Sequence, residues 1–354
     1  LVGWIMERIV SAGEPRFPAE PKNLATLVPQ GNFPGRVHVA EDYDTDIERR
    51  WWMSGKEEKQ DLPPGSKRAC RAVLTQDFDD LQGDAKTMYR AVIFNPVPGP
   101  PMGPSTRLSF KYKLHGTSTL RVQLYSLTNG YHRYLSVSDL PQDKWAEGTV
   151  DMTQMRRPDG SGGPLSADER IDDIQFYIDP RAELLIDDVV LYDAAEKDEK
   201  RPFPSRILFT GWFDTGKQGQ EWPGTFEIVP HDKPRTWKYA KSVPADAESG
   251  YRHWIRVGLR GERPLGKECA LKFHYHLEGK GPIDVILYHG GKPLPGAAGM
   301  QRVSKLQTGV WTETALKYEF PSVEKEGAVD EIRIGIRGGS TLKIDDLLLY
   351  ETNE

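Results

Sequence analysis

One stretch that occurs twice in the chain decides the fold. Residues 108–126 read LSFKYKLHGTSTLRVQLYS, and residues 271–289 read LKFHYHLEGKGPIDVILYH. The two align without a gap at an offset of 163 residues, and 8 of their 19 positions are identical. In both, large apolar residues alternate with polar ones, which is typical of a half-buried β-strand. Each copy therefore predicts a strand, a turn at glycine and a second strand.

A second pair of matching segments follows in the same order. Residues 185–192 read LIDDVVLY and residues 343–350 read KIDDLLLY, an offset of 158 residues. Matches in the same order at nearly the same offset predict two copies of one domain, each long enough to have its own core. The expected organisation is an N-terminal extension at 1–26, a first domain at 27–193, a charged linker at 194–205 and a second domain at 206–354.

The alternating pattern recurs along both copies, and no segment has a convincing helical period of 3.6 residues. The 34 Gly and 27 Pro favour many turns between short elements, while 9 Trp, 14 Tyr and 12 Phe supply bulk for cores. Strands with one buried and one polar face are typical of antiparallel sheets. We therefore predict an all-β protein made of two tandem antiparallel jelly-roll β-sandwiches related by an internal repeat.

Composition excludes several classes of function. The 354 residues include 47 basic and 52 acidic ones, with a net charge of −5, and no basic block of the kind that nucleic-acid binders use. No stretch reaches the roughly 20 apolar residues that span a bilayer. Glu7 and Arg8 interrupt the apolar N-terminal run, so we do not expect it to be an export signal. Cys70 and Cys269 fall at non-equivalent positions of the repeat and are expected to be single buried residues.

The closing segments with their acidic pairs resemble the last strand of carbohydrate-binding modules of the galactose-binding-like jelly-roll fold. Those modules open with a segment of the Asn-Gly-Asp-Phe-Glu type, to which residues 27–35 (LVPQGNFPG) and 209–214 (FTGWFD) are similar. The resemblance covers both repeats. It implies a non-catalytic pair of carbohydrate-binding modules whose partner is a polysaccharide, in a secreted or periplasmic glycan-processing system.

The same resemblance implies a structural calcium ion near the junction of the first and last strands. Calcium takes hard oxygen ligands, which the acidic pair and an acid of the opening segment would supply. By position the ligands are Asp187 in the first copy, and Asp214 and Asp345 in the second. Pro34 stands where the first copy should have its opening acid, so calcium is expected chiefly in the second. The alternative is that the aspartates only accept backbone hydrogen bonds.

Adjacent carboxylates also raise the question of glycoside hydrolysis, which uses two carboxyl groups on either side of the bond to be cleaved. Neighbours on a regular strand point to opposite faces, so neither acidic pair is expected to form such a site. A further acidic segment, DYDTD at residues 42–46, has the alternating acids of a calcium loop but no turn glycine. We interpret it as a solvated loop.

The predicted ligand-binding residues lie on the polar side of strands in the second copy. Aromatic rings stack on the C–H face of a pyranose, and Arg or His donors bind hydroxyl and carboxylate groups. The excess of cations favours an acidic glycan. Period-two spacing assigns to this face Arg252, Trp254, Arg256, His274, His276, Tyr288, Arg333 and Arg337, with Asp284 beside them.

Two other functions stay open at this point. The same Arg, His and Tyr residues suit a polysaccharide lyase, in which cations neutralise a uronate and Tyr or His moves the proton. A structural or adhesion module needs only the fold, with the polar face simply solvated. Trp145 and Trp311, which fall between the matching segments of the two copies, are expected in the cores.

Overall fold

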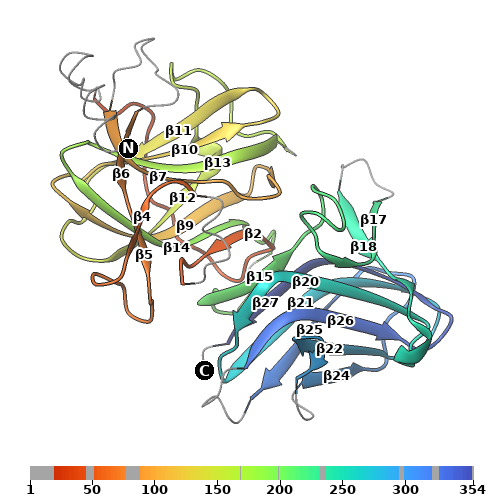
Figure 1. Ribbon diagram of the computed structural model, residues 1–354. Helices are drawn as coiled ribbons and strands as arrows, with labels where there is room; N and C mark the ends of the chain where they lie inside the picture. The colour runs from red at the N-terminus through yellow and green to blue at the C-terminus, as the bar shows by residue number, and fades with distance from the viewer. Residues whose placement is uncertain are drawn as a thin grey trace. The chain divides into compact units, whose positions relative to one another are not determined.

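The computed structural model describes residues 20–44, 52–76, 88–167, 169–197, 199–231, 237–294, 299–320 and 327–352. Most of the predicted N-terminal extension lies outside them. Regular structure in the described residues is β-strand, apart from the three-residue 3-10 turns η2 (Met152–Gln154) and η3 (Ala247–Ser249) (Figure 1). The all-β prediction is confirmed. Among these residues no helix is long and apolar enough to cross a membrane.

Contacts divide the chain into two compact units. The first unit contains residues 41–191 together with residues up to 30, and the second contains residues 192–354 together with Gly31–Ala40. The sequence predicts residues 31–40 in the first domain, whereas the division by contacts places them in the second unit. The strand that they form, β2 (Arg36–Glu41), pairs with β14 (Glu183–Asp193). Each unit is described by itself below.

The first unit consists of two β-sheets. Its strands are β1 (Leu24–Ala25), β3 (Trp52–Ser54), β4 (Lys56–Glu58), β5 (Ala69–Arg71), β6 (Val73–Gln76), β7 (Met88–Phe94), β8 (Pro101–Met102), β9 (Thr106–His115), β10 (Leu120–Ser126), β11 (Tyr131–Val137), β12 (Ala146–Asp151), β13 (Glu169–Ile178) and β14 (Glu183–Asp193). One sheet has the order β1-β11-β10-β13-β7-β3, and the other has the order β12-β9-β14-β5-β4. The ladders that join β10 to β11 and to β13 are antiparallel, while the short pair of β1 with β11 is parallel.

The core of the first unit follows the predicted alternation. On β9 the four apolar residues from Leu108 to Leu114 are each at most 2% exposed, and Leu120, Val122 and Leu124 on β10 are fully buried. Ile174 and Phe176 on β13 join them, with the Phe176 ring 5.0 Å from that of Phe110. Full burial of an apolar side chain of this size contributes about 1.5–3 kcal/mol.

The second unit repeats this arrangement. Its strands are β2 (Arg36–Glu41), of which residues 36–40 belong here, β15 (Arg206–Gly211), β16 (Gly224–Thr225), β17 (Glu227–Pro230), β18 (Lys238–Lys241), β19 (Val243–Pro244), β20 (His253–Pro264), β21 (Glu268–Glu278), β22 (Ile283–His289), β23 (Lys292–Pro293), β24 (Met300–Val303), β25 (Thr312–Glu319), β26 (Ala328–Ile336) and β27 (Thr341–Glu351). One sheet has the order β17-β18-β27-β21-β25, with β15 also beside β27. The other has the order β16-β20-β26-β22-β23, with β24 also beside β22.

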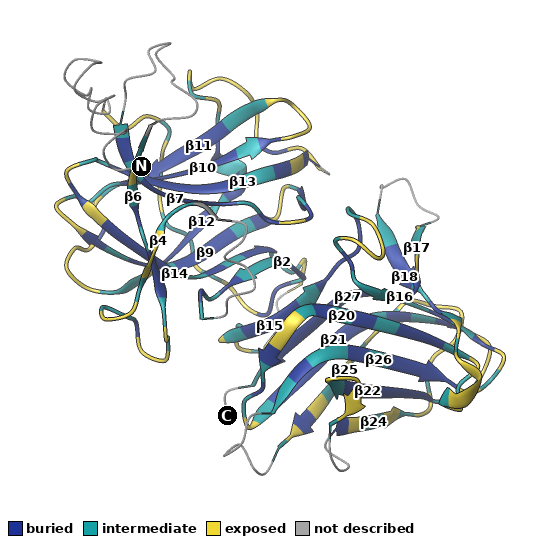
Figure 2. Ribbon diagram, in the orientation of Figure 1, coloured by how far each residue is buried: buried dark blue, intermediate teal, exposed yellow. Residues whose placement is uncertain are grey.

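Strand order confirms that the sequence repeat is a structural repeat. The order β12-β9-β14-β5 in the first unit corresponds to β25-β21-β27-β18 in the second, and β11-β10-β13-β7 corresponds to β24-β22-β26-β20. In the second unit the facing sides of both sheets form one apolar cluster, which includes Phe273 and Ile334. Figure 2 shows buried residues along β20 and β26 of one sheet and β21 and β27 of the other. Two antiparallel sheets packed through alternating apolar residues are the predicted β-sandwich.

Candidate functional site

One face of the sheet that contains β20, β26 and β22 carries most of the predicted ligand-binding residues. Pairing places Arg256 opposite Arg333, and Trp254 opposite Gly335. On the other side of β26, Tyr288 lies opposite Glu331. We call the polar and aromatic set at this place the arginine face: Tyr251, Arg252, Trp254, Arg256, Asp284, Tyr288, Arg302, Glu331, Arg333 and Arg337.

Glu331 holds the middle of the arginine face together. Its carboxylate accepts hydrogen bonds from Arg256 at 2.8 Å and from Arg333 at 2.6 Å. Burial opposes the charge of Glu331, but the two guanidinium groups hold its pKa below the ordinary value. The Arg333 guanidinium lies 3.8 Å from the centre of the Tyr288 ring, and both arginines lie over Trp254, which is only 3% exposed. Trp254 is therefore covered by arginine and is not an open stacking platform.

Asp284 organises the end of the same face. This buried carboxylate accepts hydrogen bonds from Arg302 at 2.6 Å, from Arg337 at 3.3 Å and from the Tyr251 hydroxyl at 3.0 Å. The Arg302 and Arg337 side chains are about half exposed, at 52% and 55%. Tyr251 packs so closely over Gly335 that a Cβ at residue 335 would lie 2.5 Å from its ring. Burial and the Asp284 charge raise the pKa of Tyr251.

His274 and His276 lie elsewhere, which corrects their place in the predicted face. Both are on β21, which belongs to the other sheet of the sandwich. The His274 Nδ1 atom lies 3.3 Å from Asp346 Oδ2, and the His276 ring lies 5.7 Å from that of Trp311. Period-two spacing shows which side of its own strand a residue occupies, but it does not show which sheet the strand joins.

The two tryptophans predicted in the cores are not core residues. Trp311 is 37% exposed and packs its ring 4.9 Å from His231 and 5.6 Å from Tyr239. Trp145 is partly exposed and donates a hydrogen bond to Asp61. The buried tryptophans of the second unit are Trp212 and Trp222, whose rings pack edge to face at 5.2 Å.

Sequence reasoning missed three members of the arginine face: Tyr251, Glu331 and Arg302. Tyr251 lies just before β20, outside the alternating pattern of that strand. Glu331 lies two residues before Arg333, so the period-two rule that selected Arg333 also places Glu331 on that side. Arg302 lies on β24, a strand of four residues that is too short to show a period. No sequence signal reveals that Arg302 reaches Asp284.

The equivalent face of the first unit is buried. Gln123 and Gln175 hydrogen-bond to each other at 3.1 Å, and both are at most 1% exposed. The Arg121 guanidinium lies 4.5 Å from the Tyr89 ring centre and 4.6 Å from that of Tyr177. Because Arg121 is only 8% exposed, its charge is not offered to a ligand.

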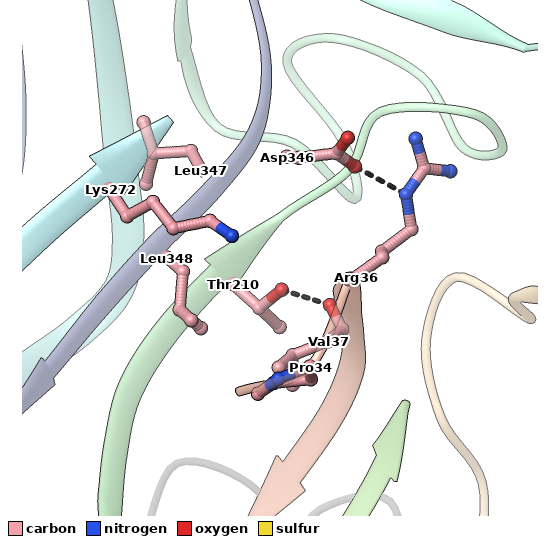
Figure 3. Close-up of a pocket in the computed structure, with 9 residues that line it drawn as sticks. Pro34, Arg36, Val37, Thr210, Lys272, Asp346, Leu347 and Leu348 are labelled. Atoms are coloured by element: carbon pink, nitrogen blue, oxygen red, sulfur yellow. Dashed lines mark hydrogen bonds and ion pairs between the residues drawn. The ribbon is translucent and has the colours of Figure 1, made fainter. Parts of the chain in front are cut away.

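Each unit also contains a cluster of three aspartates near its closing strand. In the second unit Asp214, Asp345 and Asp346 all form ion pairs with the Arg36 guanidinium. Figure 3 shows the pair with Asp346. In the first unit Asp44 accepts hydrogen bonds from the backbone of Lys67 and Arg68, as Asp214 does from Lys238. Asp44 is thus the counterpart of Asp214, and the interpretation of residues 42–46 as a solvated loop was wrong for this residue.

This equivalence also corrects the opening segment predicted for the first copy. Tyr43 lies just before Asp44, and Phe213 lies just before Asp214, the equivalent aspartate of the second unit. The two residues have left-handed φ values of 54° and 51°. The counterpart of residues 209–214 is therefore the segment that ends at Asp44. Pro34 therefore does not replace the acid of the opening segment, because Asp44 is that acid in the first unit.

The acidic pairs depart from regular strand geometry. Asp188 and Asp346 have φ values of 45° and 51°, and each donates its backbone N–H to the preceding aspartate at 2.8 Å. The left-handed residue turns the second carboxylate toward the side of the first, so that Arg36 contacts both Asp345 and Asp346. The expectation that the two carboxylates of a pair point apart was wrong. The cavity beside Asp346 is only about 10 Å³, the size of one water molecule, and it holds no sugar.

The two clusters differ in how well they fit a calcium ion. In the second unit the residues do not fit, because the Arg36 guanidinium already stands between the three carboxylates. In the first unit Asp187 is fully buried and its Oδ2 atom has no hydrogen-bond partner, while Lys111 pairs with Asp188 at 2.5 Å. Within the described residues, no group of three or more Asp, Glu, His or Cys side chains is arranged so that it could hold a metal ion. The buried oxygen of Asp187 is the one observation that fits a cation.

No family model matches the chain, and no curated protein matches it. Solved structures similar to it include carbohydrate-binding modules. The CBM22-1–CBM22-2 tandem of Paenibacillus barcinonensis Xyn10C matches 92% of this chain and 100% of that chain, with 12% identity and a TM-score of 0.29. The family 11 module of Clostridium thermocellum, in complex with a β-1,3-1,4-mixed-linked tetrasaccharide, matches 47% of this chain and 100% of that chain, with 18% identity and a TM-score of 0.32. The likeness is one of fold, and no residue role is carried from these modules to this chain.

Proposed function

We propose that the chain is a non-catalytic pair of carbohydrate-binding modules, and that the arginine face binds an acidic polysaccharide. The observation that supports this is the charge of the face: it contains five arginines and two acids, an excess of three positive charges. Both acids are already bound by arginine. The exposed donors of Arg252, Arg302 and Arg337 are thus left to an external anion.

Arginine suits this ligand better than a neutral one. A guanidinium binds a carboxylate through two parallel hydrogen bonds, and such charge-assisted bonds are about twice as strong as neutral ones. Asp284 fixes Arg302 and Arg337 in place, so less side-chain entropy is lost when a uronate binds. The partly buried rings of Tyr251 and Tyr288 lie beneath Arg337 and Arg333 and help to hold these guanidinium groups in place by cation–π contact.

The chemistry of the face favours binding over lyase activity. A catalytic tyrosine that removes a proton needs a pKa near the working pH. The pKa of Tyr251 is instead raised, and its hydroxyl donates to Asp284. That the pair serves an exported, secreted or periplasmic, glycan-processing system remains a prediction of the family resemblance.

The structural calcium ion is proposed for the first unit alone. Asp187 would hold it through the buried Oδ2 atom, with Asp44 and Asp188 as the neighbouring acids. The ion would supply positive charge to a cluster in which burial and Asp188 raise the pKa of Asp187 to about 8. It has no part in ligand binding.

The test compares a polyuronate with its methyl ester, because the two share a backbone and differ in charge. We expect the whole chain to bind the polyuronate in isothermal titration, with affinity that falls as salt rises, and to bind the ester weakly. Replacing both Arg302 and Arg337 by Ala is expected to lower the affinity about ten- to a hundredfold. Arg181→Ala, at an exposed arginine of the first unit, is the matched control.

Each other outcome points to a different function. Equal affinity for the ester would show recognition of neutral sugar and overturn the acidic ligand. Release of unsaturated uronide from the polyuronate would establish a lyase. Absence of binding to any glycan on an array would leave a structural or adhesion module.

A further inference from the structure

We infer that the second unit uses Arg36 as a built-in cation in place of a calcium ion, and that the segment carrying Arg36 is part of that unit's fold. This segment, residues 31–40, is called the strap. The inference does not depend on what the arginine face binds.

The strap is anchored in the second unit by an aromatic side chain. Phe33 is only 1% exposed, and its ring packs edge to face on Tyr350 with centroids 5.3 Å apart. The Arg201 guanidinium covers the Phe33 ring at 4.1 Å, and Lys272 Nζ lies 4.8 Å from it. A buried phenylalanine in such a setting is held as firmly as a core residue.

Hydrogen bonds fix the strap beyond Arg36. Thr210 Oγ1 donates to the carbonyl of Val37, and Trp212 Nε1 donates to the carbonyl of His38 at 3.0 Å (Figure 3 shows the first of these). The His38 ring packs on the edge of Trp212 at 5.6 Å, and its Nε2 atom lies 3.1 Å from Asp193. The strap therefore has polar and apolar partners along its length.

Arg36 occupies the position between the three carboxylates. Its Nη1 pairs with Asp214, its Nε with Asp346, and its Nη2 lies 3.4 Å from Asp345 Oδ2. The guanidinium also stacks 3.9 Å over the Trp237 ring, and the Arg36 side chain is 4% exposed. Calcium requires six to eight oxygen ligands. The carboxylates cannot surround an ion while a positively charged group stands between them.

Arg36 is the guanidinium that faces all three carboxylates of the cluster. Burial and the neighbouring Asp346 raise the pKa of Asp345 well above the ordinary value, so its charged form is disfavoured. Burial also opposes the charge of Asp346, but Arg36 and His274 hold its pKa below the ordinary value. His231 lies 3.3 Å from Asp345, His274 lies 3.3 Å from Asp346, and Lys272 lines the cavity beside Asp346.

The first unit shows what the cluster is like without such an arginine. There Lys111, the counterpart of His274, reaches only Asp188, and Asp187 Oδ2 is left buried without a partner. The three equivalent aspartates are therefore paired with a guanidinium in the second unit, whereas in the first unit one buried carboxylate oxygen has no hydrogen-bond partner. This contrast is what favours a cation substitute in the second unit rather than an ordinary ion pair.

Hydrogen exchange of the whole chain tests the inference, because it reads β10 of the first unit and β27 of the second separately in one molecule. We expect β27 of the unaltered chain to exchange equally slowly in chelator and in millimolar calcium. Arg36→Ala leaves buried carboxylates without a counterion, so β27 should exchange at least about a hundredfold faster in chelator. Calcium should restore its protection, because the three carboxylates are then free to bind the ion. Arg36→Lys should lose less protection and stay insensitive to calcium.

Arg206→Ala is the matched control, because Arg206 begins β15 as Arg36 begins β2 and pairs with Glu351 at a more exposed place. It should leave β27 unchanged. Calcium-dependent protection of β27 in the unaltered chain would overturn the inference, as would an Arg36→Ala variant that calcium does not protect. If Arg36→Ala fails to fold in chelator, refolding on addition of calcium supports the inference and failure to refold contradicts it. The effect of calcium on β10 reports only on the ion proposed for the first unit.

Discussion

The two units contain the same three aspartates in the same local geometry, yet they provide different partners for them. Asp187 in the first unit keeps a buried oxygen without a partner, whereas Arg36 binds all three carboxylates of the second. Their polar sheet faces differ as well. Gln123 and Arg121 are buried in the first unit, while Arg302 and Arg337 are half exposed in the second.

The comparison shows how a duplicated fold separates stability from binding. Strand order and core are shared, so the differences reside in single side chains at equivalent places. The cation role that we propose for Arg36 would make the second unit independent of an external ion, and the ligand that we propose would bind the open face of the other sheet of that unit. The predictions below change one side of this comparison at a time.

The largest effect is expected from Phe33→Ala. Phe33 lies between the two parts of the first unit in the sequence, but its loss should destabilise the second unit by about 3–5 kcal/mol, because a buried ring is replaced by a cavity. Denaturant unfolding with hydrogen exchange of β27 and β10 measures the two units separately. Leu24→Ala, at a residue 65% exposed, should change neither. Loss of protection in β10 and not in β27 would show that the strap stabilises the first unit instead.

Calcium should act on the first unit alone. Saturation at about 100 times the dissociation constant is expected to stabilise this unit by about 2.7 kcal/mol. The pH should act on both units, because burial also raises the pKa of Asp214 in the second unit to about 7. Without calcium, the stability of the first unit should fall as pH rises from about 4 toward 8, because burial and Asp188 raise the pKa of Asp187 to about 8 and the folded state keeps a proton that the unfolded state loses.

Asp187→Asn should remove both the calcium effect and this pH dependence. Calorimetry at pH 5 and pH 8, in chelator and in calcium, measures the stability on which both effects are read. Asp345→Asn, at the equivalent residue of the second unit, is the control and should leave the calcium effect unchanged. A first unit that gains stability between these pH values would contradict the assignment.

Arg121→Ala tests whether the face of the first unit serves the fold or the ligand. The Arg121 guanidinium lies against the Tyr89 and Tyr177 rings and accounts for about 1–2 kcal/mol by cation–π contact. We expect lower stability of the first unit with unchanged affinity for the polyuronate. Arg333→Ala, at the counterpart of Gln175, should lower affinity instead. Weaker glycan binding by Arg121→Ala would make both faces ligand surfaces.

The smallest effect is expected from Arg206→Ala. Arg206 pairs with Glu351 at 3.0 Å, with 26% of its side chain exposed, and exposed ion pairs contribute about 0–1 kcal/mol. The melting temperature of the second unit should therefore stay nearly constant. A loss as large as that of Arg36→Ala would show that any arginine at the start of this strand is needed, and that the cation position of Arg36 is not special.

Much of the fold could be predicted because it depends on local alternation. Leu271, Phe273 and Ile334 are buried as their spacing indicates, and the two acidic pairs lie at equivalent places of their closing strands. The same rule located Trp254, Arg256 and Arg333 on one sheet. It failed at His274, because the side of a strand can be inferred locally and the sheet that the strand joins cannot.

The sequence by itself determined the duplication, the antiparallel sandwiches and the polar sides of the strands, because these follow from periodicity within a few residues. Only the tertiary structure decided the partner of each acid cluster. Left-handed φ values at Asp188 and Asp346 turn adjacent carboxylates to one side, contrary to strand alternation. Arg36 reaches Asp346 across 310 residues of chain, and no local pattern records a contact of that range.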